Sequence, residues 1–163
     1  MNERWVVNAS PLIVLAQIQC EYLLVDLPGE IVVPQTVVDE INAGPANDAA
    51  RKYLSHAPLR VVAVLPEAIV QGWDLGGGET AVLSFALQNR GWRAVVDDGA
   101  ARRCAHVLGV PVIGTLGVIL RARKANLIPA AAPLLRKLKD EGFRLDDEII
   151  RAALSGTVGE EWA

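Results

Sequence analysis

Short apolar runs of strand type alternate with segments of helical period along nearly the whole chain, and this alternation restricts the fold more than any other feature. Runs rich in Val and Ile between turn residues are typical of buried strands, whereas apolar residues recurring every three or four positions indicate helices. Strands that alternate with helices predict a parallel sheet covered on both faces. We therefore expect the α/β class, with three layers (α/β/α) around a central, mostly parallel sheet. The predicted strands are 4–7, 31–33, 59–64, 94–96 and 110–113, and the predicted helices are 11–25, 36–43, 46–55, 79–88, 99–108, 115–125, 130–140 and 146–154.

The length and composition indicate one domain. A chain of 163 residues is a natural size for a single core, and 52% hydrophobic residues supply that core well. There is no internal repeat, low-complexity tract or long linker, so we expect one domain over 1–163, with C-terminal helices at about 130–154 and a frayed chain end. No apolar run approaches the roughly 20 residues that cross a bilayer, so no membrane association is expected. The apolar stretch 5–18 lacks a basic region and a cleavage site, and it is interpreted as part of the fold.

Cysteine and histidine usage argues against a soft-metal site. Cys20 and Cys104 lie in helix-like segments without metal-ligand spacing, which indicates reduced core thiols and a cytoplasmic protein. His56 and His106 are too isolated to suggest a zinc site or a catalytic triad.

Positive charge is concentrated in one part of the chain. Residues 90–139 contain ten Lys or Arg and two Asp, a local net charge of +8 in a chain whose total is −3. Such asymmetry is the usual electrostatic requirement for holding a polyanion. Ordinary solvation of helix surfaces explains the same residues, and the sequence leaves both interpretations open.

Acidic residues stand where predicted strands end or the following helices begin: Glu40, Glu79, Asp97 and Asp98, with Asn8 at the end of the first strand. Open parallel sheets bind ligands outside the carboxyl ends of their strands, where the strand order reverses, so these side chains are expected to converge there. Carboxylates without His or Cys favour a hard cation, Mg²⁺ or Mn²⁺.

Structural explanations exist for several of these residues. Glu79 could simply complement the dipole of its own helix, and Glu40 could be a solvated helix residue. The glycines 76–78 could form a bare turn or cradle a phosphate. The adjacent pair Asp97 and Asp98 is the least ordinary feature, because a turn after a strand seldom needs two such residues.

Four short motifs in order resemble the PIN-domain family, and most closely its VapC-like prokaryotic branch of toxin–antitoxin ribonucleases. The resemblance covers about residues 5–140 and rests on 7–13 (VNASPLI), 37–41 (VVDEI), 75–81 (LGGGETA) and 95–102 (VVDDGAAR), followed by 109–115 (GVPVIGT). It implies a metal-dependent ribonuclease that cuts RNA at an acidic cluster. It also implies an RNA substrate, a homodimer and a small antitoxin partner. The first family position, usually Asp, is Asn8 here.

The chemistry of phosphodiester hydrolysis assigns roles to this set. Asp97, Asp98 and Glu40 are the expected direct cation ligands, whereas Glu79 is expected either to ligate or to act as a general base. Further expected substrate-site residues are the hydroxyls of Ser10 and Thr115, which would fix a carboxylate or touch phosphate, and the guanidinium groups of Arg102 and Arg103, which would bind RNA phosphate.

Two other functions remain open at this point. Asn8 brings no charge, so the chain could be a catalytically impaired PIN-like protein that only binds RNA or a partner. A phosphoryl-transfer α/β protein, either a receiver domain or a haloacid-dehalogenase-like phosphatase, needs an Asp nucleophile after a strand. The phosphatase pattern would show Asp-x-Asp where this chain has Asn8-Ala-Ser10, and the Lys that a receiver places after its last strand is absent.

Overall fold

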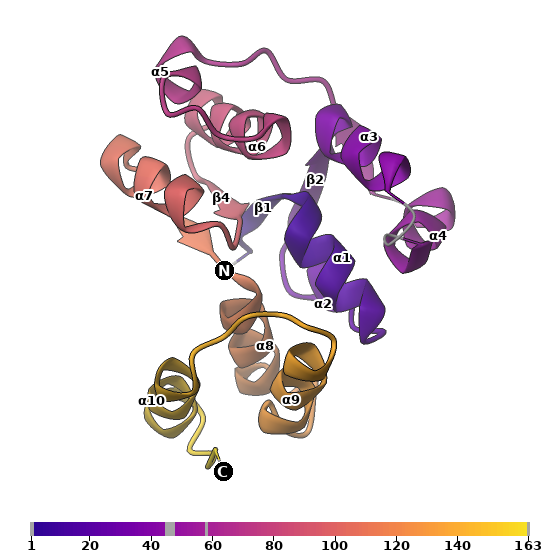
Figure 1. Cartoon of the computed structure of the whole chain (residues 1–163), viewed down its shortest axis with the longest axis vertical. Coiled ribbons are helices and arrows are strands. Elements are labelled where there is room, and N and C mark those ends of the chain that lie inside the picture. The colour runs from indigo at the N-terminus through magenta and orange to yellow at the C-terminus, as the bar shows by residue number, and fades with distance from the viewer. Residues whose placement is uncertain (1, 45–47, 58, 163) are drawn as a thin grey trace.

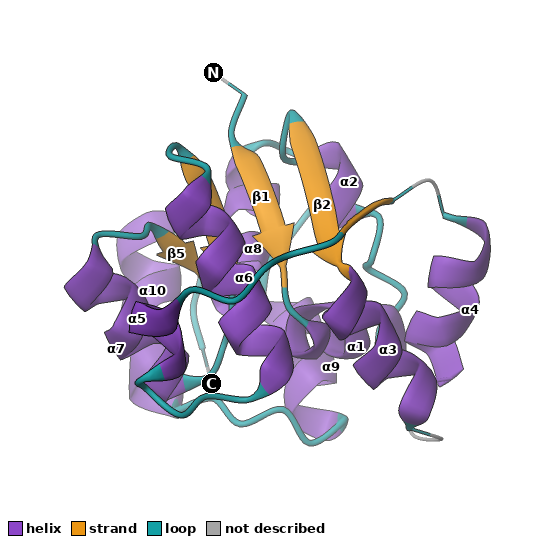
Figure 2. Ribbon diagram, turned by 90° about the horizontal axis from the view of Figure 1, so that it is seen from above, coloured by secondary structure: helices purple, strands orange, loops and turns teal. Residues whose placement is uncertain are grey.

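The computed structural model describes residues 2–44, 48–57 and 59–162, and its centre is a five-stranded parallel sheet. The spatial order is β3-β2-β1-β4-β5, and neighbouring strands pair in parallel throughout. Figure 2 shows β1 and β2 running in the same direction through the middle of the molecule. The strands are β1 (Arg4–Val7), β2 (Glu30–Pro34), β3 (Arg60–Val62), β4 (Trp92–Val95) and β5 (Val112–Ile113).

Helices cover both faces of this sheet, as expected for the α/β/α class. In Figure 1, α5, α6 and α7 lie on one side of the strands, and α1, α2 and α8 lie on the other. Helices α9 and α10 pack beyond α8 at the bottom of the same view. The helices are α1 (Ala9–Gln17), α2 (Leu23–Asp26), α3 (Gln35–Ala43), α4 (Asp48–His56), α5 (Ala68–Gln71), α6 (Gly77–Gln88), α7 (Gly99–Leu108), α8 (Thr115–Lys124), α9 (Ala132–Asp140) and α10 (Asp147–Thr157).

The strand order reverses between β1 and β4, and this reversal positions the candidate site. From β1 the chain moves outward to β2 and β3, and it then crosses the sheet to β4 and β5. The backbone N–H of Asn8 donates to the carbonyl of Val95 at 3.0 Å, which extends the β1–β4 pairing by one residue. The segments after β1 and β4 therefore leave the sheet side by side, at the place where open parallel sheets bind ligands.

The structure differs from the sequence prediction in the first helix, which does not run from 11 to 25. It ends at Gln17, and Gln19 takes a left-handed conformation with φ of 59°. The N–H of Cys20 then donates to the carbonyl of Leu15 at 2.8 Å, which closes the end of the helix. A separate short helix, α2, follows.

The C-terminal end also differs from the expected frayed tail. Trp162 is only 8% exposed, and its indole N–H donates to Asp147 at 3.1 Å. The carboxylate of Glu160 accepts hydrogen bonds from the backbone N–H groups of Ala131 and Ala132 at 2.8–3.1 Å. A carboxylate on free N–H groups at the start of a helix is favourable, so the chain end holds α9 in place.

The two cysteines are buried free thiols, as predicted, and burial raises the pKa of both Cys20 and Cys104. Among the described residues, no helix is both long and apolar enough to cross a membrane.

Candidate active site

Asn8 begins the site at the carboxyl end of β1, and its side chain is buried. The residue is 3% exposed, and its Oδ1 atom accepts no hydrogen bond within the described residues. Asn8 occupies the cap position of α1, but its side chain does not bond the free N–H groups of that helix. An unpaired buried amide oxygen costs about 1–3 kcal/mol, so this atom is suited to a ligand.

The carboxylate of Glu40 lies beside Asn8 at the first turn of α6. The backbone N–H of Gly78 donates to Oε1 of Glu40 at 2.7 Å. A Cβ atom added at Gly78 would lie 2.7 Å from Oε2 of Glu40 and 2.8 Å from Oδ1 of Asn8. Only glycine leaves room for both oxygens here, and the positive end of the helix dipole favours the carboxylate. Glu40 is therefore more than a solvated helix residue.

Asp97 lies directly beyond β4, and three donors hold its carboxylate. Oδ1 accepts from the backbone N–H of Thr115 at 2.7 Å, and Oδ2 accepts from the Thr115 hydroxyl at 2.7 Å. The hydroxyl of Ser10 donates to Oδ2 at 3.3 Å. Since Thr115 is fully buried at the start of α8, this carboxylate has a fixed direction. Ser10 and Thr115 thus hold a carboxylate, one of the two tasks the sequence suggested for their hydroxyls.

The carboxylates of Asp98 and Glu79, unlike those of Asp97 and Glu40, lie at the start of the helix that follows or contains them. Oδ2 of Asp98 accepts from the N–H of Ala101 at 2.9 Å and so caps α7, and the residue is exposed. The carboxylate of Glu79 turns back toward Gly76, at the start of its own helix.

Of the two arginines on α7, Arg102 lies close to Asp97. Nη1 of Arg102 donates to the carbonyl of Val96 at 3.3 Å. The same atom lies 2.7 Å from the position that a Cβ at Gly114 would occupy, and Oδ1 of Asp97 lies 3.0 Å from that position. Arg102 and Asp97 are therefore neighbours. Arg103 is exposed and lies against Gly99, away from that contact.

The four carboxylates do not form one tight cluster. Within residues 2–44, 48–57 and 59–162, no three His, Cys, Asp or Glu side chains come close enough together to hold a metal ion. The arrangement still fits a hard cation in one respect, because the unpaired oxygen of Asn8 and the carboxylate of Glu40 face the same small space beside Gly78. These donors are all oxygens, as Mg²⁺ and Mn²⁺ prefer.

The chain was compared with models of known protein families. The family model described as a PIN domain matches residues 4–160. The chain belongs to the PIN-domain family. PIN domains are generally nucleases that act on RNA, and they usually need divalent metal ions. None of the curated proteins matches the chain significantly.

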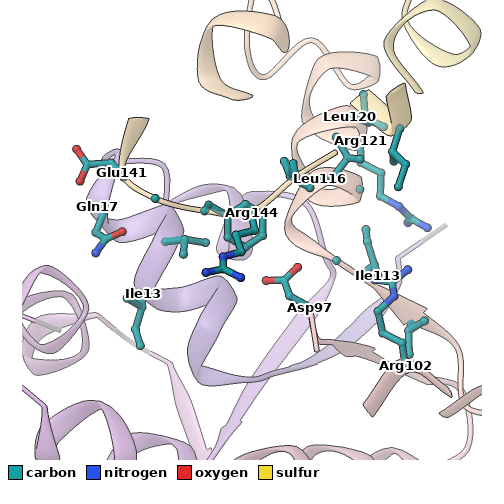
Figure 3. Close-up of a pocket in the computed structure, with 18 residues that line it drawn as sticks. Ile13, Gln17, Asp97, Arg102, Ile113, Leu116, Leu120, Arg121, Glu141 and Arg144 are labelled. Carbon is teal, nitrogen blue, oxygen red and sulfur yellow. The ribbon is translucent and has the colours of Figure 1, made fainter. Parts of the chain in front are cut away.

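A groove beside Asp97 contains a residue that the sequence analysis missed. The groove has a volume of about 970 Å³ and lies between α1, α8 and the loop that joins α9 to α10. Figure 3 shows Asp97, Arg102 and Arg144 around it, with Leu116 and Ile13 among the apolar side chains. In the sequence, Arg144 lies well after the last motif of the PIN-domain resemblance, so no sequence pattern indicated it.

Proposed function

We propose that this PIN domain is a metal-dependent endoribonuclease, a hydrolase of RNA phosphodiester bonds. The observation that carries the proposal is the unpaired, buried Oδ1 of Asn8 beside the carboxylate of Glu40, across the β1–β4 reversal from the carboxylate of Asp97. Family membership supports an RNA substrate.

In this proposal Asn8, Glu40 and Asp97 hold a Mg²⁺ or Mn²⁺ ion, and the other carboxylates assist them. Such a cation would neutralise charge that builds on phosphate oxygens and would lower the pKa of an attacking water molecule. Ser10 and Thr115 keep the carboxylate of Asp97 directed at the site.

The remaining residues of the site have proposed roles in orienting the attacking water, in supporting the metal ion and in binding the substrate. Glu79 either orients the attacking water as a general base or ligates the ion. Asp98 fixes the start of α7 and adds negative charge beside Asp97. Arg102 and Arg103 on α7 bind RNA phosphate, which positions the strand without reading its sequence.

The decisive experiment is cleavage of RNA by the purified protein with Mn²⁺ or Mg²⁺. Wild type should cut, and Asp97→Asn should lose nearly all activity. Glu40→Gln should also lose activity, whereas Asp39→Asn, one residue earlier on the exposed side of α3, should keep it. Cleavage that survives Asp97→Asn combined with Asp98→Asn would come from a contaminant and would end the proposal.

A catalytically impaired RNA- or partner-binding protein is the second candidate, and Asn8 favours it. This position is usually Asp in the family and here it carries no charge. If only that charge is missing, Asn8→Asp should switch on or strengthen Mg²⁺-dependent cleavage. Absence of cleavage by both proteins, together with salt-sensitive RNA binding, would select the binding function instead.

The finer biological assignment is a toxin of the VapC-like branch, a cytoplasmic homodimer silenced by a small antitoxin. The four ordered motifs of the sequence support it. A short overlapping reading frame that encodes a DNA-binding segment with a disordered tail should lie next to the gene, and its product should suppress cleavage. Light scattering should give twice the monomer mass of 17.5 kDa.

A further inference from the structure

We propose that Arg144 binds a phosphate of the RNA strand next to the scissile one, so that the groove beside Asp97 is the path of single-stranded substrate. This inference rests on the proposed ribonuclease function and extends it to the loop between α9 and α10. That loop lies outside the residues on which the PIN-domain resemblance was based.

The local sequence explains why Arg144 faces the groove. Phe143 and Leu145 are partly buried and pack against the core, and Arg144 between them is exposed. Alternate residues of an extended segment point in opposite directions, so anchoring the two apolar neighbours inward directs the arginine outward.

Hydrogen bonds fix both ends of the loop, and they therefore fix the backbone position of Arg144. The N–H of Phe143 donates to the carbonyl of Leu138 at 2.9 Å, after Gly142 has turned the chain with φ of 93°. At the other end, Oδ1 of Asp146 accepts from the N–H groups of Glu148 and Ile149 at 2.8 and 3.3 Å. The backbone of Arg144 is thus held between two helix ends.

The charge of Arg144 is available to a ligand. Within the described part of the chain, no carboxylate lies within ion-pair distance of Arg144 or Arg102, whereas Arg121 in the same groove pairs with Glu3. In Figure 3 the guanidinium group of Arg144 and the carboxylate of Asp97 point toward each other across the groove. A ligand that contacts Arg144 therefore extends over the proposed catalytic carboxylate.

The chemistry of the groove favours single-stranded RNA. The planar fork of a guanidinium group matches two phosphate oxygens, and Arg102 and Arg144 present two such groups along one surface. The same groove is also lined by the apolar side chains of Ile13, Leu116 and Phe143. Apolar side chains contact bases only when these are unpaired, and a duplex would keep its bases stacked inside.

The test compares Arg144→Ala and Arg144→Lys with a matched control, Arg90→Ala. Arg90 is exposed and precedes β4, at the opposite edge of the sheet, so its loss removes the same charge without touching the groove. With single-stranded RNA and Mn²⁺, Arg144→Ala should raise KM about tenfold and leave kcat within about threefold, because uniform substrate binding is lost. The KM of Arg144→Lys should lie between those of wild type and Arg144→Ala, since lysine keeps the positive charge but lacks the planar guanidinium group. Arg90→Ala should have the KM and kcat of wild type, and all variants should have the same melting temperature.

RNA binding supplies a readout that does not need cleavage. In a plot of log K against log salt concentration, the slope for single-stranded RNA should become about 0.7 less steep in Arg144→Ala, the value for one lost phosphate contact. An unchanged KM and an unchanged salt slope in Arg144→Ala would overturn this inference, even where Asp97→Asn abolishes cleavage and the ribonuclease proposal stands. If instead no form of the protein cleaves RNA, the salt slope alone decides whether Arg144 contacts phosphate. A slope change with an acidic peptide in place of RNA would assign Arg144 to a protein partner and also overturn the inference.

Discussion

The two halves of the candidate site differ in how many hydrogen bonds their side-chain oxygens accept. In the Asp97 half, formed by Asp97, Ser10 and Thr115, the chain supplies three donors to one carboxylate. In the Asn8 half, formed by Asn8, Glu40 and Gly78, one backbone N–H supports Glu40, and the side-chain oxygen of Asn8 has no partner among residues 2–44, 48–57 and 59–162. The Asp97 half is hydrogen-bonded by its own donors, whereas the Asn8 half leaves a buried acceptor unpaired within the described residues. We infer that the Asp97 half supplies orientation, and that the Asn8 half is completed by a ligand.

The largest effect should follow from removing the charge that the Asp97 half orients. Asp97→Asn keeps the shape but replaces one acceptor oxygen by an NH₂ group, which faces donors from Thr115 and Ser10. RNA cleavage should fall about a hundredfold or more, measured as kcat with Mn²⁺. Asp26→Asn, on the exposed surface of α2, is the control and should leave kcat unchanged. A kcat for Asp97→Asn equal to that of this control would remove Asp97 from the mechanism.

Removing the best donor in the same half should have the next largest effect. Thr115→Val keeps the buried volume and deletes the hydroxyl that donates at 2.7 Å to Asp97. A hydrogen bond to a charged group contributes about 1.5–3 kcal/mol, so the melting temperature should drop. Cleavage should fall about ten- to a hundredfold, as for groups that orient metal ligands. Thr115→Ser retains the hydroxyl and should recover most of the activity, and equal loss in both variants would contradict an orienting hydroxyl.

Gly78→Ala tests the Asn8 half without changing any charge. The new methyl group would meet the side-chain oxygens of Glu40 and Asn8, which are the ends of side chains and can move. Alanine in a helix is favoured over glycine by about 0.5–1 kcal/mol, so stability should hold or rise. Cleavage should nevertheless fall about tenfold, because the two oxygens are displaced.

The matched control is Gly156→Ala in α10, where a Cβ meets nothing within 4 Å. It should add helix stability in the same way and leave cleavage unchanged. If both alanine variants cleave like wild type, the space beside Gly78 has no part in the reaction.

The smallest effect is expected for Ser10→Ala. Its hydroxyl lies 3.3 Å from Oδ2 of Asp97, an oxygen that the Thr115 hydroxyl already contacts at 2.7 Å. The loss of a long, redundant hydrogen bond should change kcat by about threefold or less. A loss as large as that of Thr115→Val would show that Ser10 acts on the substrate rather than on Asp97.

The arrangement of the fold could be read from the sequence because strand and helix periods differ strongly. The runs at 4–7 and 31–33 are short and largely apolar, which favours buried strands, and the alternation with helices then predicted the parallel sheet. The end of α1 at Gln17 escaped prediction, because Ile18 and Leu23 keep helical spacing although the backbone turns left-handed at Gln19. A four-residue helix such as α5 is too short to show a period.

The site was predictable as a location and not as a set of contacts. Side chains after β1 and β4 had to share one edge of the sheet, so Asn8 and Asp97 could be expected there. Which acid caps a helix and which faces the site depends on side-chain directions. These give Asp98 to the N–H of Ala101 and turn Glu79 onto Gly76, and the sequence could offer such helix-terminal roles only as alternatives to metal binding.

A cation is expected to complete the Asn8 half of the site, and the change in melting temperature caused by Mn²⁺ is the direct measurement of its binding there. Asn8→Leu replaces the unpaired amide by an apolar group of similar size, so without metal the variant should melt higher than wild type. Wild type should gain stability as Mn²⁺ is added, because a ligand that binds only the folded state stabilises it. The leucine variant should gain almost nothing. An equal Mn²⁺-dependent rise in the melting temperature of both proteins would show that the ion binds elsewhere, and it would contradict a cation site at Asn8.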